Sequence, residues 1–204
     1  MTTALLDVSG LSCRRGGRRV FDSLSFSVAG GELLALTGRN GSGKTTLLRA
    51  IALLVPAQAG QVRWQGEDVR ADREAWCRRL AWLGHQEGLK GDLTVAENIA
   101  VAERLRGHVP EPARLQAALL AFDLDRLAHR PVRTLSAGQR RRAALARVVA
   151  SQAPLWLLDE PLNALDAAAR AALEAALSTH LAAGGLAIAA THAPLAGARA
   201  LELA

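Results

Sequence analysis

Gly38-Arg39-Asn40-Gly41-Ser42-Gly43-Lys44-Thr45 is the stretch that decides the fold of this chain. It follows the apolar run Leu33–Leu36 and leads into the helical pattern Thr46–Ile51, which is the strand-loop-helix setting of a phosphate-binding loop. Glycines let the backbone N–H groups point inward, and the start of the following helix adds the positive end of its dipole. The stretch therefore predicts a site for a polyphosphate. A glycine-rich helix start with a chance lysine is the alternative interpretation.

Two side chains of this loop are expected to act on the polyphosphate directly. Lys44 would reach the β and γ phosphates as a point charge, and the Thr45 hydroxyl would hold a Mg²⁺ that bridges them. The predicted nucleotide-binding residues of the stretch are Gly38, Arg39, Asn40, Gly41, Ser42, Gly43, Lys44, Thr45 and Thr46.

Length and composition predict one α/β domain with an insert. The chain has 204 residues, 50% of them hydrophobic, which is enough to fill a core. It has no run of about 20 apolar residues that could span a membrane. The start Met1–Ala4 lacks the basic and apolar blocks of a secretory signal, so we expect a cytoplasmic protein, soluble or peripheral to a membrane.

The charge and the cysteines narrow the class of protein only a little. A net charge of +6 suits nucleic acid, an anionic membrane surface or a nucleotide site equally well. Cys13 and Cys77 are far apart and read as ordinary reduced thiols. The run Arg14–Arg19 is typical of an exposed hairpin turn, since its two glycines are flanked by long cations.

Periodicity divides the chain into sheet and helical regions. Leu5–Val28 alternates as the edge of an antiparallel sheet does, and Leu93–Ala150 has a helical period interrupted by prolines. The apolar runs Leu155–Leu158 and Leu186–Ala190 flank the helical pattern Ala167–Ala183, which is the strand-helix-strand order of a parallel sheet.

Several candidate chemical residues follow predicted strands. Asp159 and Glu160 end a buried strand, where parallel sheets bind ligands. Asp159 would hold the Mg²⁺, and Glu160 would orient and deprotonate the attacking water. The alternative is that the pair caps the next helix. Gln86 and His192 also follow strands, so all of these strand ends are expected to meet at one nucleotide. Taken singly, each could be an ordinary surface or capping residue.

A second motif starts a predicted helix. In Leu135-Ser136-Ala137-Gly138-Gln139, Ser136 is well placed as the N-cap of the helix that continues through Arg140–Val149. Ser136 and Gly138 are further expected to face phosphate, although a plain serine cap explains the same pattern. Arg140, Arg141 and Arg142 are interpreted mostly as a solvated face, near the negative surface of a membrane.

The order of these motifs resembles that of the ATP-binding cassette (ABC) ATPases of transporters. The phosphate loop, Gln86, Leu135–Gln139, Asp159-Glu160, the loop Ala164–Asp166 and His192 occur in that family's order and approximate spacing, and they cover most of the chain. The resemblance implies an α/β P-loop NTPase fold with a mixed or parallel core sheet, an N-terminal antiparallel β subdomain and a helical insert. It divides the chain into a core, residues 1–86 and 151–204, and a helical subdomain, about 87–150.

The resemblance also implies roles for these residues. ATP and Mg²⁺ would be the cofactors, with Lys44, Glu160 and His192 catalytic and with Thr45, Gln86 and Asp159 at the metal. Further nucleotide contacts would come from Gln86, Ser136, Gly138, Gln139 and Asp166. Ser136 and Gly138 would contact the γ phosphate held by a second copy, so that two cassettes enclose two ATP molecules head to tail.

Within the family, the chain looks most like the ATP-binding subunit of the haem exporter of cytochrome c maturation. The similarity lies in the short length, Trp82–Lys90, Leu93-Thr94 with Glu97-Asn98, and an end soon after His192–Leu195. It implies a peripheral subunit at the cytoplasmic face of a bacterial inner membrane that works with integral-membrane permease partners, with the segment after Gln86 as their contact surface. The cargo, haem or a released haem chaperone, stays open.

Two positions depart from the family pattern. An aromatic that stacks on adenine often precedes the phosphate loop, whereas this chain has Arg14-Arg15-Gly16-Gly17; Arg15 is therefore the hypothetical stacking group, through its flat guanidinium. Asn163 stands where Ser or Thr is common, which would affect communication across the dimer.

The leading hypothesis is an ATPase that moves membrane partners, and two other classes compete with it. A nucleic-acid ATPase would suit the basic charge, but such proteins usually need a long coiled-coil insert or two cassettes. The span from Lys44 to Leu135 has the pattern of short helices rather than of sustained heptads, so no nucleic-acid partner is expected. A nucleotide sensor without catalysis is disfavoured by the presence of Glu160. Another small export system remains an alternative to haem export.

Overall fold

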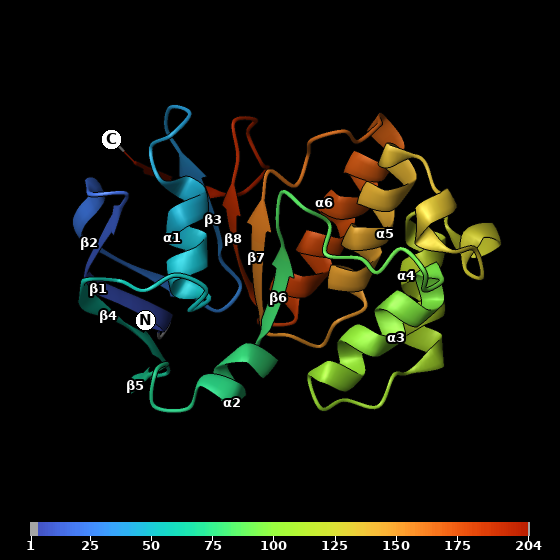
Figure 1. Cartoon of the computed structure of the whole chain (residues 1–204), viewed down its shortest axis with the longest axis horizontal. Helices are drawn as coiled ribbons and strands as arrows, with labels where there is room; N and C mark the ends of the chain where they lie inside the picture. The colour runs from blue at the N-terminus through green and yellow to red at the C-terminus, as the bar shows by residue number, and fades with distance from the viewer. Residues whose placement is uncertain (1–3, 204) are drawn as a thin grey trace.

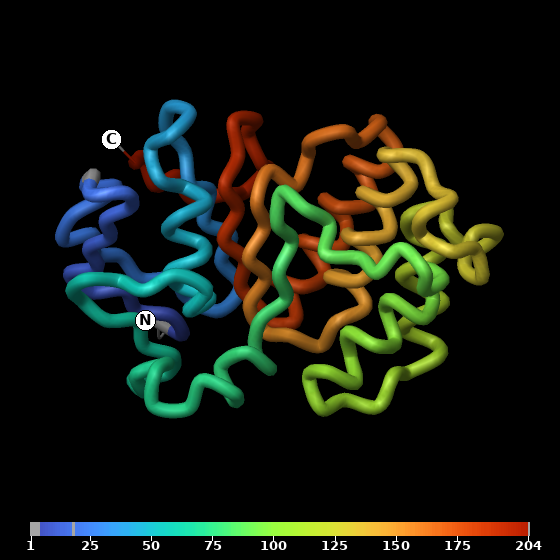
Figure 2. Tube along the Cα trace, in the orientation of Figure 1, coloured from blue at the N-terminus to red at the C-terminus, as the bar shows by residue number. Residues whose placement is uncertain are grey.

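The computed structural model describes residues 4–203, and two sheets form its framework (Figures 1 and 2). An antiparallel sheet has the strand order β2-β1-β4-β5, and a parallel sheet has the order β6-β7-β8-β3-β9. Met1–Thr3, part of the stretch on which the expected lack of a secretory signal rests, lie outside the described residues. The strands are β1 Ala4–Arg15, β2 Arg18–Ala29, β3 Leu33–Thr37, β4 Ala59–Trp64, β5 Glu67–Asp68, β6 Leu80–Leu83, β7 Leu155–Asp159, β8 Leu186–Ala190 and β9 Arg199–Glu202.

The helices lie on both faces of the parallel sheet. Helix α1 lies between the two sheets, and α3 to α6 gather on the other side of the parallel sheet (Figure 1). The helices are α1 Lys44–Ile51, α2 Arg73–Arg78, α3 Val95–Leu105, α4 Pro112–Ala121, α5 Ala137–Val149 and α6 Ala167–Ala182, with short 3-10 turns at Asp125–Leu127 and Val132–Thr134. The α/β P-loop fold with an antiparallel subdomain and a helical insert is thus confirmed.

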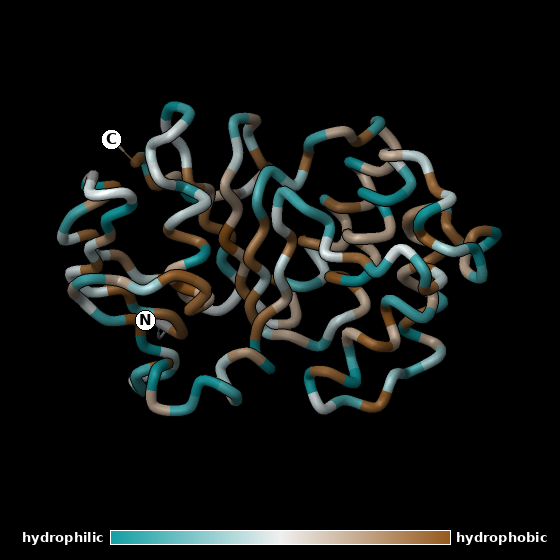
Figure 3. Tube along the Cα trace, viewed as in Figure 1, coloured by the Kyte–Doolittle hydropathy of each residue, from teal (hydrophilic) through white to brown (hydrophobic). Residues whose placement is uncertain are grey.

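The core divides into two apolar clusters because side chains alternate across each strand. In β7, Leu155 and Leu157 face α1 and the antiparallel sheet, whereas Trp156 and Leu158 face the helical block. Figure 3 shows hydrophobic colour along the central strands and hydrophilic colour on the outer loops. Since both faces of the parallel sheet are covered, its strands other than the edge strand β9 contain uninterrupted apolar runs, as in Leu155–Leu158.

Most predicted elements are present, with three additions. The hairpin turn at Gly16-Gly17 is confirmed by the antiparallel pairing of Arg15 with Arg18 and by positive φ values of 54° and 78° at the two glycines. Sequence reasoning did not predict α2, β5 or β9. Strand β9 is four residues at the edge of the parallel sheet and mostly exposed, so it carries no apolar run that would reveal it.

Candidate functional site

The phosphate loop connects β3 to α1 and depends on glycine at two positions. Gly38 has φ +129°, and a Cβ there would lie 2.3 Å from the Leu203 carbonyl oxygen. Gly43 has φ +99°, and its Cβ would lie 2.5 Å from Val20 Cγ1. Both backbone conformations are unfavourable for other residues, and neither position has room for a side chain. The loop can therefore curl closely only because these residues are glycine.

Lys44 lies at the start of α1 and is buried with its ammonium turned back over the loop. Its Nζ donates to the carbonyl oxygens of Gly38, at 2.8 Å, and Arg39, at 3.1 Å. The Nζ also lies 3.4 Å from His192 Nε2. A buried ammonium held by neutral carbonyl groups keeps its positive charge available to an anion in the loop.

The carboxylate pair at the end of β7 lies beside the loop. Asp159 is 2% exposed, and its Oδ1 accepts a hydrogen bond of 2.9 Å from the Thr45 hydroxyl. Glu160 Oε1 lies 3.4 Å from His192 Nε2. Figure 1 shows why these residues lie close together: the loops after β3, β7 and β8 all leave the parallel sheet at the carboxyl ends of its strands. Parallel strands bring their carboxyl ends together in this way.

The loop and the carboxylate open onto one shared hollow of about 320 Å³. Its walls come from the phosphate loop, the ends of β7 and β8, and the β1–β2 hairpin. The lining residues are Arg15, Val20, Asn40, Gly41, Gly43, Lys44, Thr45, Thr46, Glu160 and His192. A group bound by the loop would consequently lie within reach of Glu160 and His192.

The phosphate loop and the side chains beside it fit a metal-bound triphosphate. Ser42 Oγ is buried and has no hydrogen-bond partner among the described residues, so the loop has an unused polar group. A Cβ at Gly43 would meet Val20 and press the hairpin away from the loop. Thr45 and Asp159 supply hydroxyl and carboxylate oxygens, the donor atoms that Mg²⁺ prefers. The unused Ser42 hydroxyl and the Thr45 and Asp159 oxygens are compatible with ATP and Mg²⁺.

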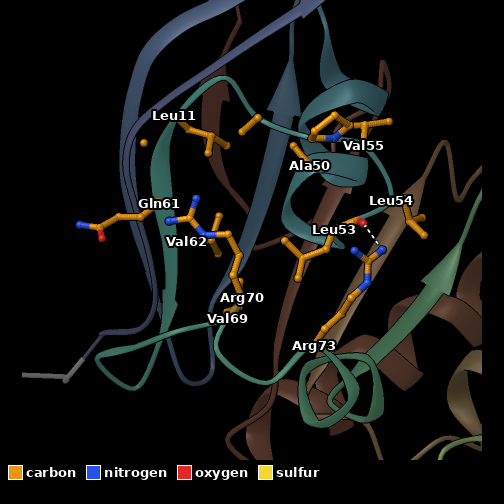
Figure 4. A pocket seen from close by; sticks show the side chains of 13 residues that line it. Leu11, Ala50, Leu53, Leu54, Val55, Gln61, Val62, Val69, Arg70 and Arg73 are labelled. Carbon is orange, nitrogen blue, oxygen red and sulfur yellow. Dashed lines mark hydrogen bonds between the residues drawn. The ribbon is translucent and has the colours of Figure 1, made fainter.

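The structure places Gln86 in a neighbouring hollow. Gln86 is exposed and lines a depression of about 530 Å³ together with Arg49, Leu54, Trp82, His85 and others. It does not line the hollow that contains Lys44 and Glu160. A further cavity of about 390 Å³ lies between the end of α1 and β4 (Figure 4), and it contains none of the predicted site residues.

The second motif lies apart from the phosphate loop within one chain. Ser136 is the N-cap of α5, where its hydroxyl accepts from the Gln139 N–H, and the Gln139 side chain accepts from the Ser136 N–H. Asp166 caps α6 by accepting from the Ala169 N–H at 2.8 Å. Neither Ser136, Gly138, Gln139 nor Asp166 lines the hollow of Lys44 and Glu160.

The interpretation of Arg140–Arg142 as a solvated face was wrong for Arg141. This side chain is 6% exposed, and its guanidinium donates to three backbone carbonyls at the ends of β6 and β7. The helical period would have revealed it, because Arg141 lies on the same face of α5 as the buried Leu145 and Val148. Sequence reasoning also missed Arg147, which binds the backbone around Gln86 from that helix.

A glycine-rich phosphate loop, a carboxylate pair on the neighbouring strand and a capped helix that starts with Ser136-Ala137-Gly138-Gln139 define an ATPase of the ABC class. The model of the ABC transporter family matches residues 21–163 of the chain. The chain belongs to this family.

Two relatives and one solved structure show what the chain is similar to within this family. The chain is similar to the cytochrome c biogenesis ATP-binding export protein CcmA of Cupriavidus necator, with 48% identity over 98% of this chain and 88% of the relative. It is also similar to CcmA of Paramagnetospirillum magneticum, with 45% identity over 100% of this chain and 95% of the relative. Among solved structures, an ATP-binding subunit of an ABC transporter superposes with a TM-score of 0.84 at 26% identity, covering 92% of this chain and 80% of that one.

Proposed function

We propose that the chain is the ATP-hydrolysing subunit of an export system in the biogenesis of c-type cytochromes, working in haem export or in release of a haem chaperone. The observation that supports it most directly is the shared hollow in which the Lys44 ammonium, the Asp159-anchored Thr45 hydroxyl and the Glu160 carboxylate meet. The similarity to export proteins named for cytochrome c biogenesis, over nearly the whole chain, supports the assignment of the pathway.

In this proposal the residues of the hollow divide the work. Lys44 and the loop N–H groups compensate the charge of the β and γ phosphates, and Thr45 and Asp159 would hold Mg²⁺. The metal, when bound, neutralises charge that develops on the phosphate oxygens. Glu160 accepts a proton from water at its carboxylate. His192, between Lys44 Nζ and Glu160 Oε1, keeps the carboxylate oriented.

A second copy of the chain would complete the site. Ser136, Gly138, Gln139 and Asp166 lie outside the hollow of their own chain, so we assign them to the nucleotide held by the other copy, head to tail. Residues 87–150 would then act as a helical unit that presents Ser136, beside a core of residues 1–86 and 151–204. Gln86 would reach the metal only when its loop moves toward the first hollow.

The depression around Gln86 is the proposed contact surface for integral-membrane permease subunits. Three arginines, Arg49, Arg106 and Arg147, and the histidine His85 line it, and none of its lining residues is a carboxylate. The apolar Leu54 and Trp82 lie in the same depression, and Leu54 is 57% exposed. A partner segment with an acidic residue beside a large apolar one would be complementary to it.

The proposed location is the cytoplasmic face of the bacterial inner membrane, where the chain would be held by those subunits. Within the described residues, no helix has both the length and the apolar character to cross a bilayer. Membrane association in this proposal depends on the partner surface around Gln86.

Two variants test the hydrolytic assignment. Glu160→Gln is expected to bind ATP normally and to lose turnover by about 10²–10⁴-fold, because the general base is lost while the phosphate contacts remain. Lys44→Ala is expected to lose binding itself, since the phosphate charge is left uncompensated. Glu174→Gln, an exposed carboxylate on α6, is the matched control and should hydrolyse ATP at the parent rate. Full turnover by Glu160→Gln, or tight ATP binding by Lys44→Ala, would refute the assignment.

A pull-down tests the partners. Glu160→Gln, loaded with ATP and added to detergent-solubilised membranes of a bacterium that makes c-type cytochromes, should retain integral subunits of the haem-handling system. The same variant with Arg49→Glu should retain much less of them. Retention of unrelated permeases only would place the chain in another export system.

A further inference from the structure

Glu160 has an unusual backbone conformation for a residue with a side chain. It follows β7 with φ +49°, in the left-handed region that favours glycine. Such a conformation persists only where the surroundings determine it, and it is found most often at functional sites. Two backbone hydrogen bonds hold it: the Glu160 N–H donates to Ala190 O at 2.9 Å, and the Glu160 carbonyl accepts from the Asn163 N–H at 3.2 Å.

A third contact to Glu160 comes from the buried side chain of Arg141. Its Nη2 donates to the carbonyl oxygens of Glu160 and, at 3.1 Å, Asp159, and its Nη1 donates to the Gly84 carbonyl at 3.0 Å. The planar guanidinium therefore joins the ends of β6 and β7. Burial lowers the pKa of Arg141, and the nearby carboxylates of Glu87, Asp159 and Glu160 oppose that shift. No carboxylate of the described residues forms an ion pair with Arg141, so its buried charge is held by these three carbonyl oxygens.

Arg147 makes a similar connection further along the same helix. Its guanidinium donates to the carbonyls of Gly88, at 2.9 Å, Glu87, at 3.0 Å, and Trp82, at 3.2 Å. These residues surround Gln86 on both sides. Helix α5 thus binds the backbone of the Gln86 segment through Arg147 and the backbone of Glu160 through Arg141, and it starts at the Ser136 cap.

We propose that Arg141 is a positioning residue that fixes the left-handed turn at Glu160 and so aims its carboxylate into the hollow of Lys44. Arg141 and Arg147 connect the Glu160 turn and the Gln86 segment to the same helix, α5. The inference depends on the proposed role of Glu160 and adds to it how that carboxylate is placed. A lysine cannot replace the arginine fully, because the Gly84 carbonyl is bound by Nη1 and the Asp159 and Glu160 carbonyls by Nη2, whereas an ammonium has a single nitrogen.

The test compares Arg141→Gln and Arg141→Lys with Arg142→Gln. Arg142 is a matched control because it is the next residue of α5 and contacts the Phe122 carbonyl and Asp123, away from the sheet. Arg141→Gln is expected to lower kcat by about 10–100-fold, since a displacement of about 1 Å has that effect, with the KM and Kd for ATP within about 3-fold of the parent. Arg141→Lys should be intermediate, and Arg142→Gln should keep the parent kcat.

A double variant separates positioning from a general structural role. If Arg141 acts through Glu160, adding Arg141→Gln to Glu160→Gln should slow single-turnover ATP cleavage by less than about 3-fold. The inference is overturned if the two losses multiply, if Arg141→Gln keeps full kcat, or if its KM rises in step with a falling kcat. Should Arg141→Gln not fold, the same comparison is made with Arg141→Lys. An active Glu160→Gln would instead refute the proposed function.

Discussion

Replacing Gly43 with alanine is expected to destabilise the protein through two separable effects, both visible in the structure. The first is the backbone, since φ at this position is +99°, which costs a residue with a Cβ about 1–2 kcal/mol. The second is contact with the hairpin, because the new Cβ would lie 2.5 Å from Val20 Cγ1 and force one of them to move, at about 1–3 kcal/mol. Together they predict a loss of about 2–5 kcal/mol of unfolding free energy.

The two effects can be separated with Val20→Ala, which removes the opposing methyl groups. In that background the contact is relieved and the backbone cost remains, so Gly43→Ala should be less damaging by about 1–3 kcal/mol. The free energy of unfolding is measured by urea unfolding of the parent, Gly43→Ala, Val20→Ala and the double variant, followed by fluorescence of the four tryptophans. If the two substitutions add within about 0.3 kcal/mol, the close approach of hairpin and phosphate loop is not as the structure places it.

Three further predictions concern stability away from the hollow. Burial lowers the pKa of His180, which stacks on Trp156 at a ring-centroid distance of 4.0 Å. The unfolded chain therefore protonates His180 more readily than the folded chain does. The free energy of unfolding that neutral His180 contributes above pH 6.5 is lost as the pH falls below that value. His180→Phe should show a smaller fall of the urea midpoint between about pH 7 and about pH 5, and an unchanged fall would contradict the reasoning. Thr94→Ala removes a capping box at the start of α3 and should cost about 1 kcal/mol, whereas Thr179→Ala, on an exposed turn of α6, should stay within about 0.5 kcal/mol in the same unfolding assay. Trp76→Phe leaves the Ile51 carbonyl without its indole N–H donor and should lower the free energy of unfolding by about 1–3 kcal/mol; an unchanged urea midpoint would show that this bond does not matter.

The main elements could be predicted because their signals lie in consecutive residues. An apolar run followed by Gly41-Ser42-Gly43 and a helical pattern predicts a phosphate loop from neighbouring residues alone, and the apolar run that ends at Asp159 predicts a buried strand in the same way. Strand β9 had no such signal, since its pairing with β3 depends on backbone hydrogen bonds at a sheet edge. The prediction for Arg141 was wrong for a related reason. Three consecutive arginines, Arg140–Arg142, indicated a solvent-exposed face, although the helical period of α5 places Arg141 on its buried face.

The sequence by itself determined the class of this protein and the chemistry that its residues can perform, because a phosphate loop and a strand-end carboxylate are each encoded over a few neighbouring positions. Only the tertiary structure decided that Lys44 and His192, 148 positions apart, lie 3.4 Å from one another above the same hollow as Glu160. It also decided that Gln86 faces a different depression and that Arg141 joins two strand ends. The physical reason is that these relations arise from strand order and from hydrogen bonds to backbone carbonyls. Every residue has such a carbonyl, so the amino-acid sequence contains no pattern that predicts which carbonyl is bound.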